Sequence, residues 1–428
     1  MSPLKLTIPG HYWDTQIYQG RLYLFDREGG ILTLDWDRLI EVLPVDNALK
    51  LALVCALKRS DYLYRVAATG IFHDEEFKTI MNSRFAALAE TPLVLEEEQI
   101  KEASLGQQEN RFPFPHADST VYYRRLYVSA QSGVFSANCN GQTKYPISTR
   151  VERLWDGPVL ALGASYNSLS LAAGEAGLWE YDLSSTGGAG LWEYDTNSPF
   201  TRLSESAPEA NPRPLAEQHC SECQWAFHSV YGSSLTGPGV LAAYYRTRGE
   251  SDEESYTPRK KSYRREFDRL IPEKEIFSDF EEPAGVYSWA AQDKICQAAN
   301  GSIRVAKYQP WDQEEPIKRL GLLSLERHGE AIVSAKVALF GTVVELDSSL
   351  VVISSDGEIL SIAGEPVSWR VFPRSRHYEN HLHIIYDDRL EVLSFNHDYL
   401  LDQREKVSGI SGWFGRNNKK SFDSLRLH

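Results

Sequence analysis

Residues 350–362 read Leu-Val-Val-Ile-Ser-Ser-Asp-Gly-Glu-Ile-Leu-Ser-Ile, and this stretch decides the fold class. Two short apolar runs, Leu350–Ile353 and Ile359–Ile362, flank Asp356-Gly357, a dipeptide that favours the tight turn of a β-hairpin. The first run is apolar at every position, which is typical of a strand covered on both faces. The stretch therefore predicts an antiparallel hairpin within a layered β-structure.

The same unit recurs along the chain at intervals that scatter around the roughly 40 to 50 residues of a propeller blade. The other clear cases are Leu22–Phe25 with Ile31–Leu34, Leu126–Val128 with Gly133–Phe135, Leu169–Leu171 with Gly177–Trp179, Ile295–Gln297 with Gly301–Ile303, and His381–Ile385 with Leu390–Leu393. Tyr62–Tyr64 with Gly70–Phe72 and Trp225–Phe227 with Gly239–Leu241 are weaker. We therefore predict an all-β fold, a β-propeller of about seven four-stranded blades with a range of about six to eight. A pair of β-sandwiches or a β-helix would also give many hairpins and remains an alternative.

The hairpin spacing resembles that of the WD40-like propeller class over most of the chain. Two Trp-Asp dipeptides are present, Trp13-Asp14 and Trp155-Asp156. Both stand before their hairpin, whereas the WD40 pattern places the dipeptide late in the repeat, and no Gly-His pair precedes them. The resemblance is therefore one of fold and implies a divergent propeller.

We expect residues 1–403 to form a single propeller closed by the N-terminal strand, in which Leu4–Ile8 completes the blade that contains Leu390–Leu393. Insertions are expected near 74–117, 196–218 and 246–283, because these polar stretches bury too little surface to offset their ordering entropy. Residues 404–428 are expected to form a flexible C-terminal tail.

One inserted helix is predicted from Asp74, a suitable N-cap residue. Downstream of it, the apolar residues fall on one helical face and the charged residues lie elsewhere. These apolar residues are Phe77, Ile80, Met81, Phe85 and Leu88. We expect the helix to cover an exposed blade edge; a docking face for a partner is the alternative.

Composition narrows the function classes. A formal charge of −14 and a pI near 5.4 disfavour binding to nucleic acid and to anionic membranes. Five cysteines form an odd and sparse set, which indicates a reducing compartment. Because no apolar run reaches the roughly 18 residues of a membrane span and none resembles a signal peptide, we predict a cytoplasmic location.

Two groups of residues have metal-binding character. His219, Cys220, Cys223 and His228 include a Cys-x2-Cys pair, and His377, His381 and His383 include a His-x-His pair. The first group has Ser233 where a zinc knuckle would continue with cysteine, and the second has no third ligand at a fixed spacing. We predict no metal, with buried thiols in the first group and a solvated or partly buried strand face in the second.

No compact catalytic motif is intact. Gly163-Ala-Ser165-Tyr-Asn167 approaches a nucleophile elbow but has Asn in place of the second glycine, and its surroundings indicate a hairpin. Phosphate-cradling and calcium-binding loops are absent from the sequence. We predict no cofactor.

Unusual features concentrate on residues suited to binding a partner. The heptapeptide Ala-Gly-Leu-Trp-Glu-Tyr-Asp occurs at 176–182 and again at 189–195, so that Trp179 and Trp192 form two like aromatic positions. In a strand, Trp179 would share a face with Tyr181. A neutral duplication in a tolerant loop is the competing interpretation. The other candidates are the basic residues Arg259, Lys260, Lys261, Arg264 and Arg265 and the tail residues Trp413 and Phe414.

These features favour a non-enzymatic protein-protein interaction scaffold or a subunit of a larger assembly. An enzyme with its active site in the propeller funnel is the alternative, because propeller enzymes assemble their sites blade by blade without compact motifs. A nucleic-acid-associated subunit acting through the basic loop 259–265 is a further alternative.

Overall fold

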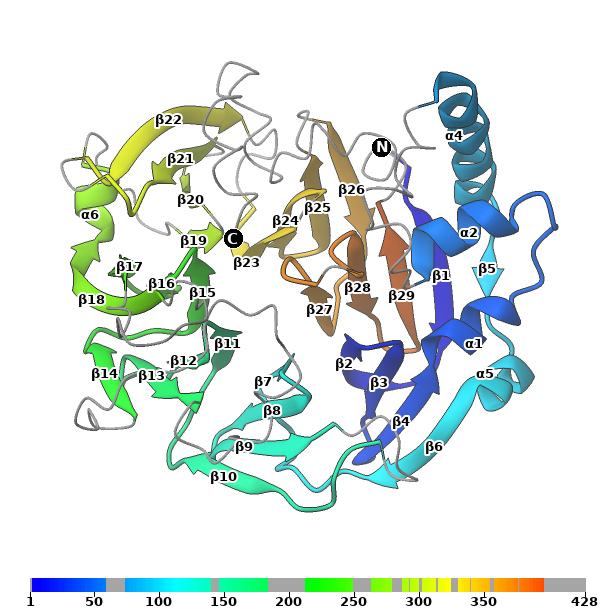
Figure 1. Cartoon of the computed structure of the whole chain (residues 1–428), viewed down its shortest axis with the longest axis horizontal. Coiled ribbons are helices and arrows are strands. Elements are labelled where there is room, and N and C mark those ends of the chain that lie inside the picture. Colours follow the sequence, from blue (N-terminus) through cyan, green and yellow to red (C-terminus); the bar gives the residue numbers. More distant parts are fainter. Residues whose placement is uncertain are drawn as a thin grey trace, which may run out of the picture. The chain divides into compact units, whose positions relative to one another are not determined.

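The computed structural model describes residues 2–58, 74–139, 146–183, 212–248, 263–278, 287–291, 293–299, 302–312, 315–324, 330–338, 340–354, 358–375 and 377–395. These residues form seven sheets, the blades of an all-β propeller (Figure 1). The predicted fold class is confirmed, and so is the resemblance to the WD40-like class at the level of the fold. We name each blade after its first strand. The described chain divides into two compact units, one built from residues within 1–114, 137–151 and 332–413 and the other from residues within 115–136 and 152–331.

Unit 2 carries four blades, each an antiparallel meander in chain order. Their strands are β7 (Asp118–Tyr122), β8 (Arg125–Ala130), β9 (Gly133–Asn138) and β10 (Glu152–Trp155); β11 (Ala161–Ser165), β12 (Ser168–Ala172), β13 (Leu178–Asp182) and β14 (Arg213–Ala216); β15 (Glu222–Ala226), β16 (Ser229–Ser233), β17 (Val240–Arg248) and β18 (Tyr263–Pro272); and β19 (Tyr287–Ala291), β20 (Lys294–Ala299), β21 (Ser302–Tyr308) and β22 (Ile317–Ser324). A short helix, α6 (Glu273–Ile276), follows β18.

Unit 1 carries the other three blades. Their strands are β2 (Tyr12–Tyr18), β3 (Arg21–Asp26), β4 (Gly30–Asp35) and β6 (Ser104–Glu109); β23 (Ile332–Ala338), β24 (Gly341–Leu346), β25 (Ser349–Ser354) and β26 (Ile359–Ala363); and β27 (Ser368–Val371), β28 (His381–Ile385), β29 (Arg389–Ser394), β1 (Leu4–Pro9) and β5 (Leu93–Val94).

The N-terminal strand and the last described strand, β29, meet in the β27 blade. Strand β1 pairs antiparallel with β29, with Leu6 opposite Val392 and Ile8 opposite Leu390. The side chains of Leu6 and Ile8 are fully buried. This is the pairing that the sequence predicts for the N-terminal strand, and the short strand β5 then pairs in parallel with the other side of β1.

The predicted hairpins occupy the expected places in their blades. In the β2, β7, β11, β19 and β27 blades they form the second and third strands, whereas the Asp356-Gly357 hairpin forms the third and fourth strands of the β23 blade. The weaker prediction at 225–241 is wrong in its pairing, because Trp225 lies in β15 and Leu241 in β17, the first and third strands of the β15 blade, with β16 between them. The prediction at 62–72 lies outside the described residues.

Two predicted insertions contain blade strands, which corrects the expectation of loops. The region 74–117 holds β6, and the region 246–283 holds the end of β17, the whole of β18 and helix α6. Both β6 and β18 are outermost strands with polar sequences, Ser-Leu-Gly-Gln-Gln-Glu in the case of β6. Because an outermost strand keeps one face in solvent, it has no continuous apolar run to reveal it. Most of the region 196–218 lies outside the described residues.

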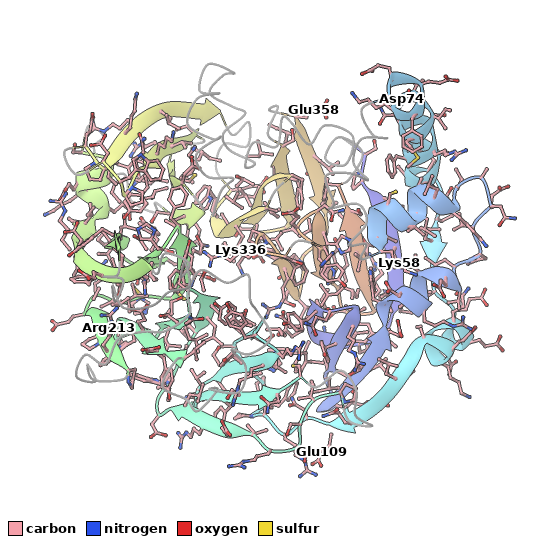
Figure 2. All side chains as sticks on the ribbon, in the orientation of Figure 1. Lys58, Asp74, Glu109, Arg213, Lys336 and Glu358 are labelled. Carbon is pink, nitrogen blue, oxygen red and sulfur yellow. The ribbon has the colours of Figure 1, made fainter. Side chains whose placement is uncertain are left out.

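More than one helix is present, which corrects the expectation of a single one. The described residues include α1 (Trp36–Glu41), α2 (Lys50–Leu57), α4 (Glu75–Ala89) and α5 (Glu97–Ala103), all between β4 and β6. The predicted helix is α4, with Asp74 at its start (Figure 2). The Asp74 side chain caps it by accepting from the Phe77 amide at 2.8 Å. Met81, Phe85 and Leu88 are buried in one core with Leu6 and Ile8 of β1, whereas Ile80 is 42% exposed. Helix α4 thus packs against β1 of the β27 blade, which we call the closing blade.

Candidate functional site

The topology gives every blade two unlike ends. In a four-stranded meander, the first turn and the third connection emerge at the same end and the second turn emerges at the other. The second turns are short, with 234–239 the longest, whereas the third connections include residues 36–103, 139–151, 183–212 and 249–262. We call the end with the first turn and the third connection the insertion end of a blade.

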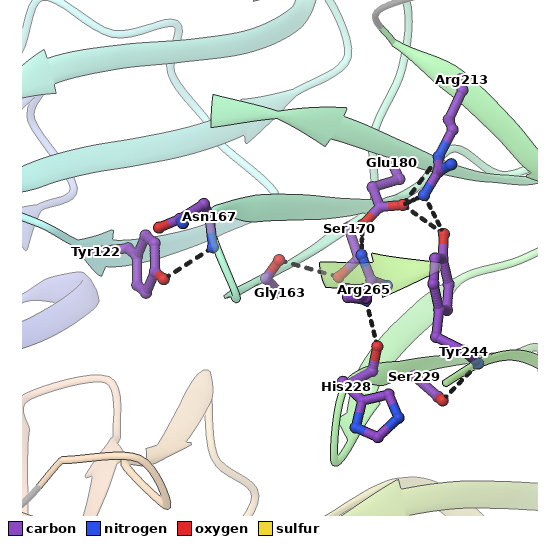
Figure 3. A network of polar contacts seen from close by, with 10 residues as sticks. All are labelled: Tyr122, Gly163, Asn167, Ser170, Glu180, Arg213, His228, Ser229, Tyr244 and Arg265. Atoms are coloured by element: carbon purple, nitrogen blue, oxygen red, sulfur yellow. Dashed lines mark hydrogen bonds and ion pairs between the residues drawn. The ribbon is translucent and has the colours of Figure 1, made fainter. Parts of the chain in front are cut away.

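A buried ion network joins the β11 and β15 blades within unit 2. Glu180 of β13 is 3% exposed, and its carboxylate accepts from the Arg213 side chain at 2.5 Å and from the Tyr244 hydroxyl at 2.5 Å (Figure 3). Arg265 of β18 donates to the other carboxylate oxygen and also to the backbone carbonyl of His228. The Arg265 guanidinium lies 3.4 Å from the centre of the Tyr244 ring.

Electrostatics fix the charge state of this network. Burial alone would raise the pKa of Glu180, but Arg265 and Arg213 outweigh it and, with the Tyr244 hydroxyl, lower that pKa to about 2. Glu180 is therefore a carboxylate at neutral pH whose oxygens are saturated by internal donors. A carboxylate held in this way is suited to fastening two blades together.

Arg265 was expected in a surface basic patch, and the structure corrects this. Its side chain is 11% exposed and paired with Glu180, so its positive charge is neutralised inside unit 2. The sequence could not show this because the partner lies 85 residues away on another blade. For Arg264 the structure describes only the backbone, which pairs with Thr247 in the β17–β18 ladder.

Trp179 lies on β13 with the predicted alternation. Leu178 and Glu180 are buried, whereas Trp179 and Tyr181 are half-buried on the opposite face. The Trp179 ring lies 4.9 Å from that of Trp155, and its indole nitrogen donates to the Ala176 carbonyl at 2.7 Å. Several predicted partner-binding residues lie outside the described residues: Trp192, Arg259, Lys260, Lys261, Trp413 and Phe414.

The Cys-x2-Cys group takes part in blade packing. Cys220 and Cys223 are both buried, and burial raises the pKa of the Cys220 thiol to about 12. The Cys223 sulfur lies 3.5 Å from the Ala161 carbonyl oxygen, and the His219 ring contacts the Ser234 hydroxyl at 2.7 Å. Across the described ranges, no three His, Cys, Asp or Glu side chains come together as a metal-binding group.

The His-x-His pair lies in the core of the closing blade, which corrects the expectation of a solvated or partly buried face. His381 and His383 share a face of β28 as predicted, with ring centres 5.9 Å apart, and both are fully buried. The His381 ring lies 3.4 Å from the Ala56 carbonyl oxygen of α2, and the His383 ring lies 3.4 Å from the Thr15 hydroxyl of β2. Burial lowers the pKa of His381 to about 4.

A second buried carboxylate was not found from the sequence. Glu273 of α6 is 4% exposed and accepts from the Gly239 amide, the Gln297 side chain and the Ser288 hydroxyl, the last at 3.0 Å. The local sequence around Glu273 is acidic and does not predict that this residue is buried. The helical turn of α6 after β18 directs it between the β15 and β19 blades.

No protein-family model matches the chain, and no curated protein matches it either. Solved structures do match. The computationally designed Ika8 protein is 10% identical, and the match covers 92% of this chain and 100% of that one at a TM-score of 0.43. The AfRom2 CNH domain is 11% identical over 65% of this chain and 80% of its own, at a TM-score of 0.36. A COPII outer coat vertex protein is 10% identical over 70% and 74%, at a TM-score of 0.42. At these values the likenesses carry no functional argument, and the fold assignment rests on the seven sheets themselves.

Proposed function

We propose that this chain is a non-enzymatic scaffold that binds protein partners at the insertion ends of its blades. The observation that carries the proposal is the placement of extra sequence: the two longest connections, 36–103 and 183–212, join third to fourth strands, while the second turns stay short. Loops mounted at one end of a rigid blade are where proteins most often place binding residues.

The buried acids of unit 2 support a structural role over catalysis. Glu180 and Glu273 are each surrounded by internal donors, and neither carboxylate reaches solvent. Catalytic carboxylates need access to a substrate atom at hydrogen-bond distance.

The proposal includes a cytoplasmic location, which the five buried cysteine thiols support. In the described part of the chain, no helix is long and apolar enough to cross a membrane.

Trp413 and Phe414 remain the proposed anchor of a docking tail, and they provide the first test. Replacing both with alanine should weaken capture of a protein partner by about 1 to 3 kcal/mol and leave the melting temperature unchanged. The matched control is Phe422→Ala on the same tail, for which we expect full recovery of the partner in a pull-down. Equal recovery of the partner by the double variant would show that the tail is not part of the interface. A specific turnover by the isolated protein would favour the enzyme alternative.

A further inference from the structure

Three blades of unit 2 begin their first turn with an aromatic residue in the left-handed backbone conformation. Tyr123, Tyr166 and Phe227 have φ angles of 46°, 49° and 51°. Each is the first of two residues that separate the first strand of its blade from the second. Because a Cβ atom crowds the neighbouring carbonyl in this conformation, such turns favour glycine, asparagine or aspartate.

The β2 blade of unit 1 shows the turn without an aromatic residue. Its first turn is Gln19-Gly20, with φ angles of 49° and 76°. The turn can therefore be built from small or flexible residues, and an aromatic ring is not required to make it. Bulky residues that keep a disfavoured backbone conformation cluster at functional sites in proteins.

Aromatic rings gather at the insertion ends of four blades of unit 2, and we call them the aromatic row. The Tyr122 and Tyr123 ring centres are 4.3 Å apart, and the Asn167 amide donates to the Tyr122 hydroxyl at 3.1 Å, which ties the β7 turn to the β11 turn (Figure 3). Tyr166 then contacts the His228 ring at 6.2 Å. Phe227 contacts Trp311 of the β21–β22 connection at 5.4 Å.

Two rings of the row are exposed to solvent. Tyr123 is 38% exposed and Trp311 is 53% exposed. In the sequence, Arg124 follows Tyr123 and Asp312 follows Trp311, so one residue of each charge stands beside the two exposed rings. A row of neutral rings with hydroxyl and indole donors matches a ligand with flat apolar side chains and exposed carbonyl acceptors. A proline-rich chain in the polyproline II conformation has both properties.

We propose that this aromatic row, Tyr122, Tyr123, Tyr166, Phe227 and Trp311, binds a proline-rich extended segment of a partner protein. The inference deepens the proposed scaffold function and rests on it. The aromatic side chains serve binding at the expense of turn geometry.

The test measures affinity and stability on the same variants of the full-length protein. The probe is a synthetic decaproline peptide, titrated by calorimetry and by Trp fluorescence, beside arginine-rich and Gly-Ser peptides of equal length. Tyr123→Asn should lower affinity for decaproline at least about fivefold, while the melting temperature stays equal or rises because asparagine suits the turn. Trp311→Ala should lower affinity by a similar factor. Gln19→Asn is the matched control, since it makes the same replacement in the same turn position of unit 1 and should leave affinity unchanged.

Three results would overturn the inference. A lower melting temperature for Tyr123→Asn would make the ring a packing residue. Tighter binding of the arginine-rich peptide than of decaproline would make the row a cation-binding surface. Absence of decaproline binding to the unaltered protein would show that the row is not a proline-rich binding site. If the pull-down still captured a partner, the proposed scaffold function would hold without this site.

Discussion

The Glu180 network of unit 2 and the histidine pair of unit 1 bury ionisable groups by opposite means. Glu180 stays charged because two guanidinium groups and a phenol satisfy its oxygens. His381 and His383 stay neutral because burial lowers the pKa of both, and His381 and Arg370 lower that of His383 further. Within the described residues, Nδ1 of His381 and Nε2 of His383 have no hydrogen-bond partner.

The difference teaches where each region obtains its stability. The β11 and β15 blades are joined by a paired charge, which is costly to break because the remaining guanidiniums would be stranded. The closing blade is held by strand pairing and apolar burial, and its histidines tolerate burial only while they are deprotonated. Acid and mutation should therefore affect the two regions in different ways.

The largest effect is expected at the closing strand. The double variant Leu6→Ala with Ile8→Ala removes two fully buried side chains and should cost at least about 4 kcal/mol of unfolding free energy. Lys5→Ala with Thr7→Ala is the control on the alternate positions of the same strand and should cost less than about 1 kcal/mol. Urea denaturation of both variants checks this, and equal losses would contradict closure by apolar burial.

Glu180→Gln should have the next largest effect. It leaves Arg213 and Arg265 without their carboxylate and should cost about 3 to 5 kcal/mol. Glu152→Gln is the matched control, because Glu152 pairs with Arg125 at 2.6 Å but is 42% exposed, so its loss should cost less than about 1 kcal/mol. Similar midpoints for the two variants in urea would show that the network does not fasten the blades.

Acid should loosen the closing blade before it weakens the network. The folded pKa of His381 is about 4 against an ordinary 6.5, so the unfolded chain binds the proton first and stability falls from pH 6.5 toward pH 4, by up to about 3 kcal/mol. The contribution of Glu180, whose pKa falls from 4.5 to about 2, is complete above pH 4.5 and is lost only below it.

The variant His381→Phe separates the pH range in which His381 takes up its proton from the range in which Glu180 does. The Ala56 carbonyl keeps its bonds from Asn380 and Ser394 in this variant, so no acceptor is stranded. Unfolding free energies measured at several values between pH 7 and pH 4 should decline less steeply than in the unaltered protein. An unchanged slope would place the acid sensitivity elsewhere.

The smallest effect is expected at an exposed ion pair. Arg27 and Asp387 are 2.7 Å apart and join the β2 and β27 blades, but Asp387 is 86% exposed. Asp387→Asn should change the melting temperature little, since exposed pairs contribute about 0 to 1 kcal/mol. A loss comparable with that of Glu180→Gln would show that pairing matters more than burial.

The sequence revealed those parts of the fold in which burial leaves a local pattern. Inner strands such as β25 are apolar at their central positions, and Asp74 together with Met81, Phe85 and Leu88 marks α4. The sequence of the outer strand β18 predicts a loop, because its charged residues give no apolar run and their partners lie far away in the sequence.

Much of the candidate site depends on contacts between blades, which no local pattern encodes. Arg265 looks like any surface arginine until Glu180 is placed beside it. The left-handed turn at Tyr123-Arg124 has none of the Asn-Gly chemistry by which such turns are found in a sequence.

Site-specific photo-crosslinking tests the central claim, binding at the insertion ends, most directly. A photo-reactive residue is placed at Arg124 or Trp311, at the insertion ends of the β7 and β19 blades, or at Leu235, in the β16–β17 turn at the opposite end of its blade and 55% exposed. With a partner copurified from native extract, the account predicts crosslinks from positions 124 and 311 and none from 235. Crosslinks to that partner from 235, with none from 124 or 311, would contradict it.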